Sequence, residues 1–144
     1  EENETSLSAE IVGTHCIKSY YNAYLRGWDN KTEWFVGTVP ECEKCAEHWT
    51  IEDRGGKVTL KENCTGKYLR ANEEYYVDLA DIAKSNEMWK PVKNSDGSLS
   101  FDSAHGTWLR AQPHGRVSLQ RNHGTDETFR LEPWTGYNSG LHRC

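Results

Sequence analysis

The side chains best suited to ligand recognition lie in the segment from Gly27 to Trp34. This segment carries two indole rings, Trp28 and Trp34, next to the carboxylate of Asp29 and the amide of Asn30. Sugar sites commonly stack the apolar face of a pyranose on an aromatic ring, while carboxylate and amide groups bond its hydroxyls. The segment therefore predicts a sugar-binding loop; the alternative is a hairpin whose rings pack down onto the protein.

Two later segments offer side chains of the same kinds. Asn72, Tyr75 and Tyr76 lie in the first of them, and Gln112 and His114 lie in the second. Amide, phenol and imidazole groups all exchange hydrogen bonds with hydroxyls. We interpret these residues as further ligand contacts in loops that match the Trp28 segment.

The cysteines are candidates for disulfide bonds: Cys16, Cys42, Cys45, Cys64 and Cys144. Cys42 and Cys45 have the spacing of a redox or zinc pair, but a thioredoxin-like site requires a βαβ context and a structural zinc requires a second pair. We expect a disulfide in this loop instead. The sequence leaves the pairing open, and a bond between the Cys42/Cys45 loop and Cys64 is among the pairings that the expected fold allows.

The number of cysteines is odd, so at least one thiol has no intramolecular partner in a monomer. Cys144 lies on a polar tail, where a second chain reaches a thiol most easily. This favours a disulfide-linked homodimer through Cys144. The alternative is an internal bond from Cys144 to Cys16.

Other candidate sites have weaker patterns. His105, His114 and His123 recur every nine residues but lack the spacing of known zinc motifs, so we interpret them as surface histidines. The sequence contains no recognisable set of nucleophile, base and orienting residue, and no glycine-rich phosphate loop. We therefore predict that the protein is not an enzyme and uses neither a metal nor a cofactor.

An internal repeat of about 40 residues must position these side chains. Leu25, Leu69 and Leu109 are 44 and 40 residues apart, within the segments Tyr24-Leu25-Arg26, Tyr68-Leu69-Arg70 and Trp108-Leu109-Arg110. A second mark follows each segment: Glu47-His48-Trp49, Glu87-Met88-Trp89 and Glu127-Thr128-Phe129. We expect the repeated apolar residues in the core. The repeated arginines are either three anion contacts or side chains that lie along the surface.

Each unit resolves into four short strands. Val58 and Leu60, like Leu99 and Phe101, alternate with polar residues, which is the pattern of a half-buried strand. Three four-stranded units predict an all-β fold, a β-trefoil in which the first and fourth strands form a six-stranded barrel capped by three hairpins. The expected domain covers 11–134, with repeats at about 11–53, 54–94 and 95–134 and polar tails at 1–10 and 135–144.

The Gly-x-Tyr-Leu-x-Ala segment beginning at Gly66, followed by a Glu-x-Trp mark, resembles the fascin-like branch of the β-trefoils over residues 11–134. The Glu-x-Trp marks also lie where ricin-type lectins keep Gln-x-Trp. The first resemblance implies actin binding in the cytosol, and the second implies sugar binding through an Asp and an aromatic residue in each unit. Because Glu replaces Gln here, only the architecture is carried over and no site.

The net charge of -5, from 22 acidic and 17 basic residues, argues against a nucleic-acid or anionic-membrane partner. No apolar run approaches the roughly 20 residues of a membrane span, so no membrane insertion is expected.

Three N-glycosylation sequons, at Asn3, Asn30 and Asn63, together with the cysteines, indicate an oxidising secretory compartment. The chain begins with Glu1, as a chain cleaved from a signal peptide would. The predicted function is therefore a secreted, N-glycosylated module that binds a glycan or an extracellular protein through its loops. The alternatives are a cytosolic fascin-like actin-binding protein, and a protease inhibitor or cytokine-like ligand of the same fold.

Overall fold

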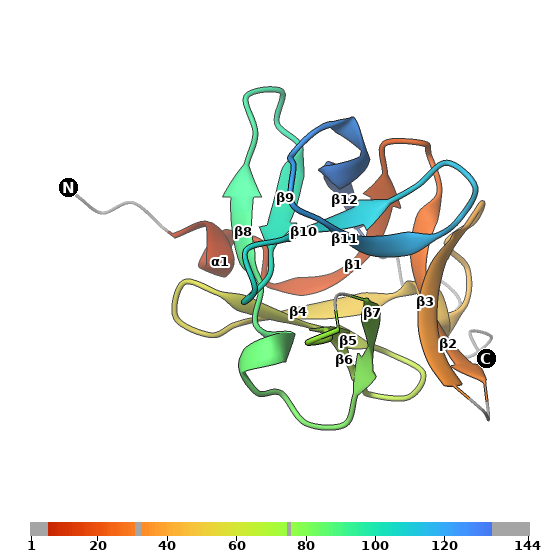
Figure 1. The fold of residues 1–144 in the computed structure, drawn as a ribbon. Helices are drawn as coiled ribbons and strands as arrows, with labels where there is room; N and C mark the ends of the chain where they lie inside the picture. The colour runs from red at the N-terminus through yellow and green to blue at the C-terminus, as the bar shows by residue number, and fades with distance from the viewer. Residues whose placement is uncertain (1–5, 31–32, 75, 134–144) are drawn as a thin grey trace.

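The protein is an all-β structure, seen in a computed structural model that describes residues 6–30, 33–74 and 76–133 (Figure 1). Its strands are β1 (Gly13–Ser19), β2 (Tyr24–Asn30), β3 (Glu33–Val39), β4 (Trp49–Asp53), β5 (Val58–Glu62), β6 (Tyr68–Ala71), β7 (Val77–Ala80), β8 (Lys90–Lys93), β9 (Leu99–Asp102), β10 (Trp108–Ala111), β11 (Val117–Gln120) and β12 (Phe129–Pro133). The helical elements are α1 (Leu7–Glu10) and the 3-10 turns η1 (Cys45–Glu47), η2 (Ser85–Glu87) and η3 (Thr125–Glu127). In the described part of the chain, no helix has the length and apolar character needed to cross a membrane.

The first and fourth strands of the three units pair into a nearly closed, barrel-like sheet. β1 lies between β12 and β4, β4 continues to β5, and β8 continues through β9 to β12. The junction between β5 and β8 is a single antiparallel bridge, in which the backbones of Val58 and Trp89 exchange hydrogen bonds of 2.8 and 2.9 Å. Because β1 pairs with β12, the two ends of the described chain are held side by side. The prediction of an all-β fold with twelve strands is confirmed.

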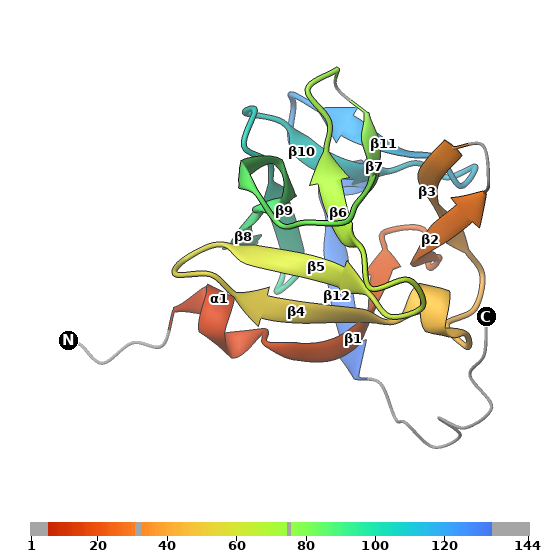
Figure 2. The ribbon, with the colours of Figure 1, turned by 90° about the horizontal axis from the view of Figure 1, so that it is seen from below.

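The remaining strands form three antiparallel hairpins, β2–β3, β6–β7 and β10–β11. Figure 2 shows them gathered on one side of β1, β4 and β5. The sequence strand–hairpin–3-10 turn–strand occurs three times along the chain, once for each sequence unit.

The repeated apolar residues form the core, as the repeat predicts. Leu25, Leu69 and Leu109 are completely buried and belong to one cluster with the indoles of Trp49 and Trp89. The two indole N–H groups donate to carbonyl oxygens inside that cluster, from Trp49 to Leu25 at 2.9 Å and from Trp89 to Leu69 at 3.0 Å. A buried indole requires such a partner, so each bond fixes a hairpin onto the strand that follows it.

The glutamate of each second mark is buried and structural. Oε1 of Glu47, Glu87 and Glu127 accepts a hydrogen bond of 2.6 Å from the backbone N–H three residues earlier, at the start of the 3-10 turn. The first-turn N–H groups have no partner within the turn itself, so the carboxylate satisfies one of them. This role explains why Glu recurs at this position in all three units.

The repeated arginines form ion pairs within their own units. Arg70 binds Asp78 through two parallel bonds of 2.8 and 2.7 Å. Arg26 lies 3.3 Å from Glu47, and Arg110 lies 3.3 Å from Asp126. Their guanidinium groups therefore compensate acidic groups of the fold, which accounts for the repeat without a bound anion.

Two disulfides are present: Cys16–Cys42 lies within unit one, and Cys45–Cys64 joins unit one to unit two. Cys42 and Cys45 therefore bond to different partners. The bond from the Cys42/Cys45 loop to Cys64 is confirmed. The alternative bond between Cys16 and Cys144 is wrong, because Cys16 bonds Cys42. Cys144 lies outside the described residues, and the homodimer stays a prediction.

One buried acidic group should make stability depend on pH. Glu62 is 1% exposed; its Oε1 accepts from Thr65, whereas its Oε2 accepts no hydrogen bond from any described residue. Burial raises the pKa of Glu62, although the bonds from Thr65 and the charge of Arg26 act in the opposite direction. The folded chain thus holds this proton more tightly than the unfolded chain, so ionisation of Glu62 lowers stability as pH rises through the raised pKa.

We expect Glu62→Gln to raise the free energy of unfolding at neutral pH. The difference from wild type should shrink as pH falls, because protonated Glu and Gln are both neutral. Urea titrations of both proteins across the acid range measure the difference. A wild type that is more stable than Glu62→Gln at neutral pH would show that the Arg26 charge outweighs burial.

Candidate functional site

The predicted Trp28 loop is part of a long hairpin. Strand β2 continues to Asn30, and β3 begins at Glu33. Trp28, Asp29 and Trp34 are therefore strand residues, and Asp29 lies opposite Trp34. The expectation of a loop at these three positions is wrong, because cross-strand pairing extends almost to the end of the hairpin. Asn30 is the last residue of β2.

The other predicted contacts lie in two separate turns. Between β6 and β7, Asn72 accepts from Glu74 N at 2.9 Å and donates to Asp78 at 3.4 Å, while Tyr76 is 47% exposed. Tyr75 lies outside the described residues. Between β10 and β11, Gln112 accepts from Ser118 at 3.5 Å, and His114 is exposed. The amides of Asn72 and Gln112 thus have partners within their own hairpins, and ligand binding at these positions stays a prediction.

A polar hollow of about 230 Å³ lies elsewhere, where unit one meets unit three. Three segments line it: the β1–β2 turn, the β8–β9 turn and the start of β12. These turns lie along the upper edge of Figure 1. The lining residues are Lys18, Ser19, Tyr20, Asn22, Asp96, Ser98, Thr128, Phe129 and Arg130. The pairing of β1 with β12 brings these distant segments together.

The β1–β2 turn presents two tyrosines to solvent. Ser19 Oγ accepts from the backbone N–H groups of Tyr21 and Ala23 at 3.1 and 3.3 Å, and Asn22 has a φ of 63°, in the left-handed region that Asn tolerates. This tight turn leaves the Tyr20 side chain 57% exposed. The Tyr20 and Tyr21 rings meet edge to face at 5.2 Å, which fixes the orientation of both.

Tyr21 is held from its other end. Its hydroxyl donates to Asp126, and this bond raises the pKa of the Tyr21 phenol, so the group stays a neutral donor. The turn is therefore anchored to η3 as well as to β1, and Tyr20 stands at the rim of the hollow on a fixed support.

The opposite wall carries a carboxylate. Asp96 Oδ1 accepts from the hydroxyl and the backbone N–H of Ser98, at 2.6 and 2.9 Å, and these bonds, with the nearby Arg130 charge, lower the pKa of Asp96. Arg130 lies 3.5 Å from Asp96 Oδ2. The wall therefore presents an ionised acceptor beside guanidinium donors, the combination that binds vicinal hydroxyls.

At the floor, Lys18 donates to Glu132 at 3.2 Å, and Tyr24 donates to the same carboxylate at 2.8 Å. The Tyr24 bond, followed by the Lys18 contact, lowers the pKa of Glu132. Lys18, which lines the hollow, therefore forms an ion pair with Glu132 that has no net charge.

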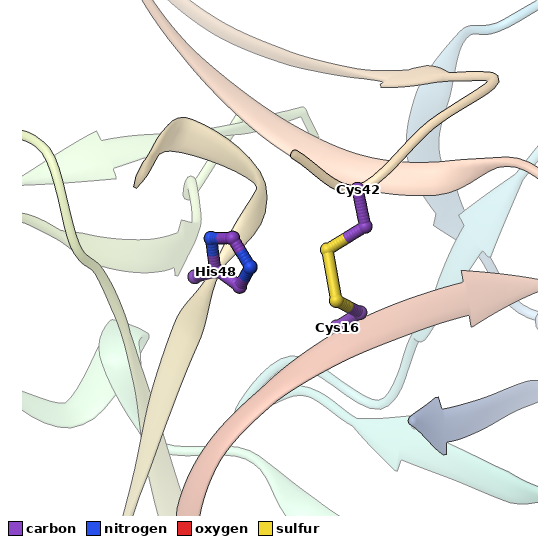
Figure 3. A group of neighbouring side chains, drawn as sticks. All are labelled: Cys16, Cys42 and His48. Carbon is purple, nitrogen blue, oxygen red and sulfur yellow. A yellow bond between two sulfur atoms is a disulfide. The ribbon is translucent and has the colours of Figure 1, made fainter. Parts of the chain in front are cut away.

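Cys16, Cys42 and His48 have metal-ligating atoms within 4.8 Å of one another. Figure 3 shows the two sulfurs bonded to each other with the imidazole beside them. Thiolate ligands would require that bond to be broken. The buried His48 also donates through Nδ1 to Lys44 O at 2.8 Å. In this oxidised state the group is a packed disulfide.

Tyr20 and Tyr21 are not among the predicted ligand contacts, although their position outside the repeat pattern distinguishes them in the sequence. Tyr20-Tyr21-Asn22 occupies the turn between the first and second strands of its unit. The corresponding turns carry Asn63-Cys64-Thr65 and Ala104-His105-Gly106, without a Tyr, Trp or Phe side chain. Aromatic residues outside the repeat are those that core packing does not require.

No protein-family profile matches this chain, and no curated protein sequence matches it. Solved structures do share its fold. A mosquitocidal holotoxin superposes with a TM-score of 0.76 at 13% identity, covering 87% of this chain but only 18% of the toxin chain. The cytolethal distending toxin of Haemophilus ducreyi gives 0.73 at 13% identity, covering 94% of this chain and 90% of that chain. SeviL bound to the asialo-GM1 saccharide gives 0.70 at 16% identity, covering 85% of this chain and 99% of that chain. At these identities the likeness shows the fold alone.

Proposed function

We propose that this protein is a secreted, N-glycosylated β-trefoil module that binds a glycan and catalyses no reaction. The observation that carries the proposal is the exposed ring of Tyr20 at the rim of a hollow lined by Asn22, Asp96 and Arg130. An aromatic face beside convergent amide, carboxylate and guanidinium groups is what a pyranose requires. The side chains lie on turns supported by a rigid barrel, where recognition residues usually occur.

The β-trefoil assignment has two supports. Six strands from three units form the nearly closed barrel, and one hairpin from each unit lies on one side of it. The superposition on SeviL, whose structure contains a saccharide, covers nearly the whole of both chains. That likeness supports glycan binding, and the surface around Tyr20 is the one that we propose for it.

We expect Tyr20→Ala to weaken glycan binding by about tenfold or more, because truncating a central aromatic contact commonly costs 1–2 kcal/mol or more. A printed glycan array identifies the ligand, and calorimetry with the strongest glycan measures the change. Ile82→Ala is the matched control, since Ile82 is 63% exposed and does not line the hollow. Tyr76→Ala tests the β6–β7 turn. Loss of binding in Tyr76→Ala with retention in Tyr20→Ala would move the site to that turn.

Secretion is supported by the two intramolecular disulfides, which weigh against the cytosolic fascin-like alternative. Asn63 is exposed in the turn after β5, as a glycosylated residue must be. We expect protein from a eukaryotic secretory host to carry glycans at Asn30 and Asn63. Intact mass before and after endoglycosidase treatment measures this, and unmodified peptides at both sites would contradict it.

A further inference from the structure

A second hollow, of about 280 Å³, lies beside the Tyr20 hollow. Its lining comes from β10, the end of β11 and the segment that leads into β12: Arg110, Gln120, Asn122, His123, Gly124, Thr125, Asp126 and Glu127. The His123 ring packs against Trp108 with 4.7 Å between the ring centroids and an angle of 58° between the planes, and His123 shares a 2.7 Å hydrogen bond with Ser100, which holds this wall in place.

The two hollows share one stretch of chain. Thr125, Asp126 and Glu127 line the second hollow, and the next three residues, 128–130, line the first. The Thr128 hydroxyl donates back to Thr125 O at 2.8 Å, so this bond joins a residue of the first hollow to a residue of the second. From Thr125 to Arg130 the chain spans about 15 Å, from the rise of a 3-10 turn and a strand.

The tyrosine pair joins the hollows on the outer side. Tyr20 lines the first hollow and contacts the Tyr21 ring edge to face. Tyr21 in turn donates to Asp126, which lines the second. Both tyrosine rings are partly exposed, with Tyr21 at 36%. The polar walls and the aromatic ridge therefore form one continuous surface.

The charges on this surface compensate one another. Lys18 pairs with Glu132, Arg130 with Asp96, and Arg110 with Asp126 and Glu127. Each of these cations already lies next to a carboxylate, so none of them is left to bind an anionic group of a ligand. A sialic acid or sulfate placed here would lie beside the carboxylates of these pairs, and this like-charge proximity disfavours an anionic ligand.

We propose that the two hollows form a single site for a neutral oligosaccharide, which spans from Asp96 and Tyr20 to Gln120 and Asn122. This inference rests on the proposed glycan-binding function and specifies its ligand class. One sugar ring occupies the first hollow against Tyr20. Later rings cross the Tyr21 ridge and bond the amide of Asn122 and the amide nitrogen of Gln120, whose oxygen accepts from Arg121 N at 2.9 Å. A single monosaccharide fills only part of this surface.

The test is an array of glycans of one to six residues, each neutral and in a sialylated form, followed by calorimetry with the strongest neutral glycan and its shorter fragments. We expect the full glycan to bind at least tenfold more tightly than its terminal monosaccharide, and its sialylated form to bind more weakly. Asn122→Ala should lower affinity for the full glycan at least threefold. Asn86→Ala, which removes an amide outside both hollows, should not change it.

Each other result contradicts the inference in a specific way. Equal affinity for the monosaccharide and the full glycan, or an unchanged Asn122→Ala, would remove the second hollow from the site while glycan binding itself stands. A preference for sialylated glycans would overturn the neutral ligand class. Absence of binding to every printed glycan would overturn both this inference and the proposed function. The length series uses the wild-type chain, so it does not depend on the folding of a variant.

Discussion

Replacing Trp89 with alanine is expected to lower the free energy of unfolding by about 3–5 kcal/mol, the usual cost of truncating a buried aromatic side chain. Trp89 is completely buried, and its indole N–H donates to Leu69 O inside the β6–β7 hairpin. Its backbone also makes the bridge to Val58 that joins β5 to β8. The substitution therefore leaves a cavity beside the β5–β8 junction and removes the indole donor to Leu69 O in the hairpin. Urea titration followed by far-ultraviolet circular dichroism measures the change.

Two variants separate the contributions. Trp89→Phe keeps most of the ring but loses the indole donor, so it should cost less than Trp89→Ala. Ile82→Ala removes an exposed side chain and should change stability by less than about 0.5 kcal/mol. A Trp89→Ala protein within about 1 kcal/mol of wild type would contradict the assignment of this residue to the core.

The double variant Cys16→Ser/Cys42→Ser is expected to lower stability by about 3–4 kcal/mol. The bond closes a loop with a sequence separation of 26 residues, and the chain-entropy relation gives a loss of this size. Cys16 is also buried on β1, between the partners β4 and β12, so the variant places a hydroxyl against the barrel. Denaturant titration of the oxidised proteins provides the measurement.

Cys45→Ser/Cys64→Ser is the comparison for that prediction. Its bond closes a shorter span, with a separation of 19 residues, so the same relation gives a slightly smaller loss of about 3 kcal/mol. Loss of less than about 1 kcal/mol in the Cys16/Cys42 variant would mean that the surrounding strands hold the loop without the bond.

The repeat in the sequence was sufficient to predict an all-β fold of twelve strands and its buried positions, because residues at equivalent positions must meet equivalent surroundings. Leu69 and Trp89 are buried for this reason. Glu87, like Glu47 and Glu127 at the equivalent positions, accepts a hydrogen bond from the backbone N–H three residues earlier in its own unit. The disulfide pairing could not be predicted, since it depends on how close Cys16 comes to Cys42 after folding. In the sequence, Cys42 lies much closer to Cys45 than to Cys16, so spacing alone does not indicate the observed partner.

The candidate site was harder to predict for a physical reason. Tyr20 and Asp96 are far apart in the sequence and meet because β1 pairs with β12 and β12 with β9. The Trp28 segment has the composition of a sugar site, but its residues continue the β2–β3 pairing. Composition alone does not show which side chains line a hollow, because strand pairing determines which segments meet.

An NMR titration tests whether a glycan binds across the two hollows, because it locates the ligand without altering a residue. Uniformly nitrogen-15-labelled protein is titrated with the glycan that binds most strongly on the array. A glycan bound across both hollows should give the largest amide shift changes in residues 18–22, 96–98 and 120–130, the segments that line them. Shift changes confined to residues 72–76 or 112–115, with residues 19–22 unmoved, would contradict it.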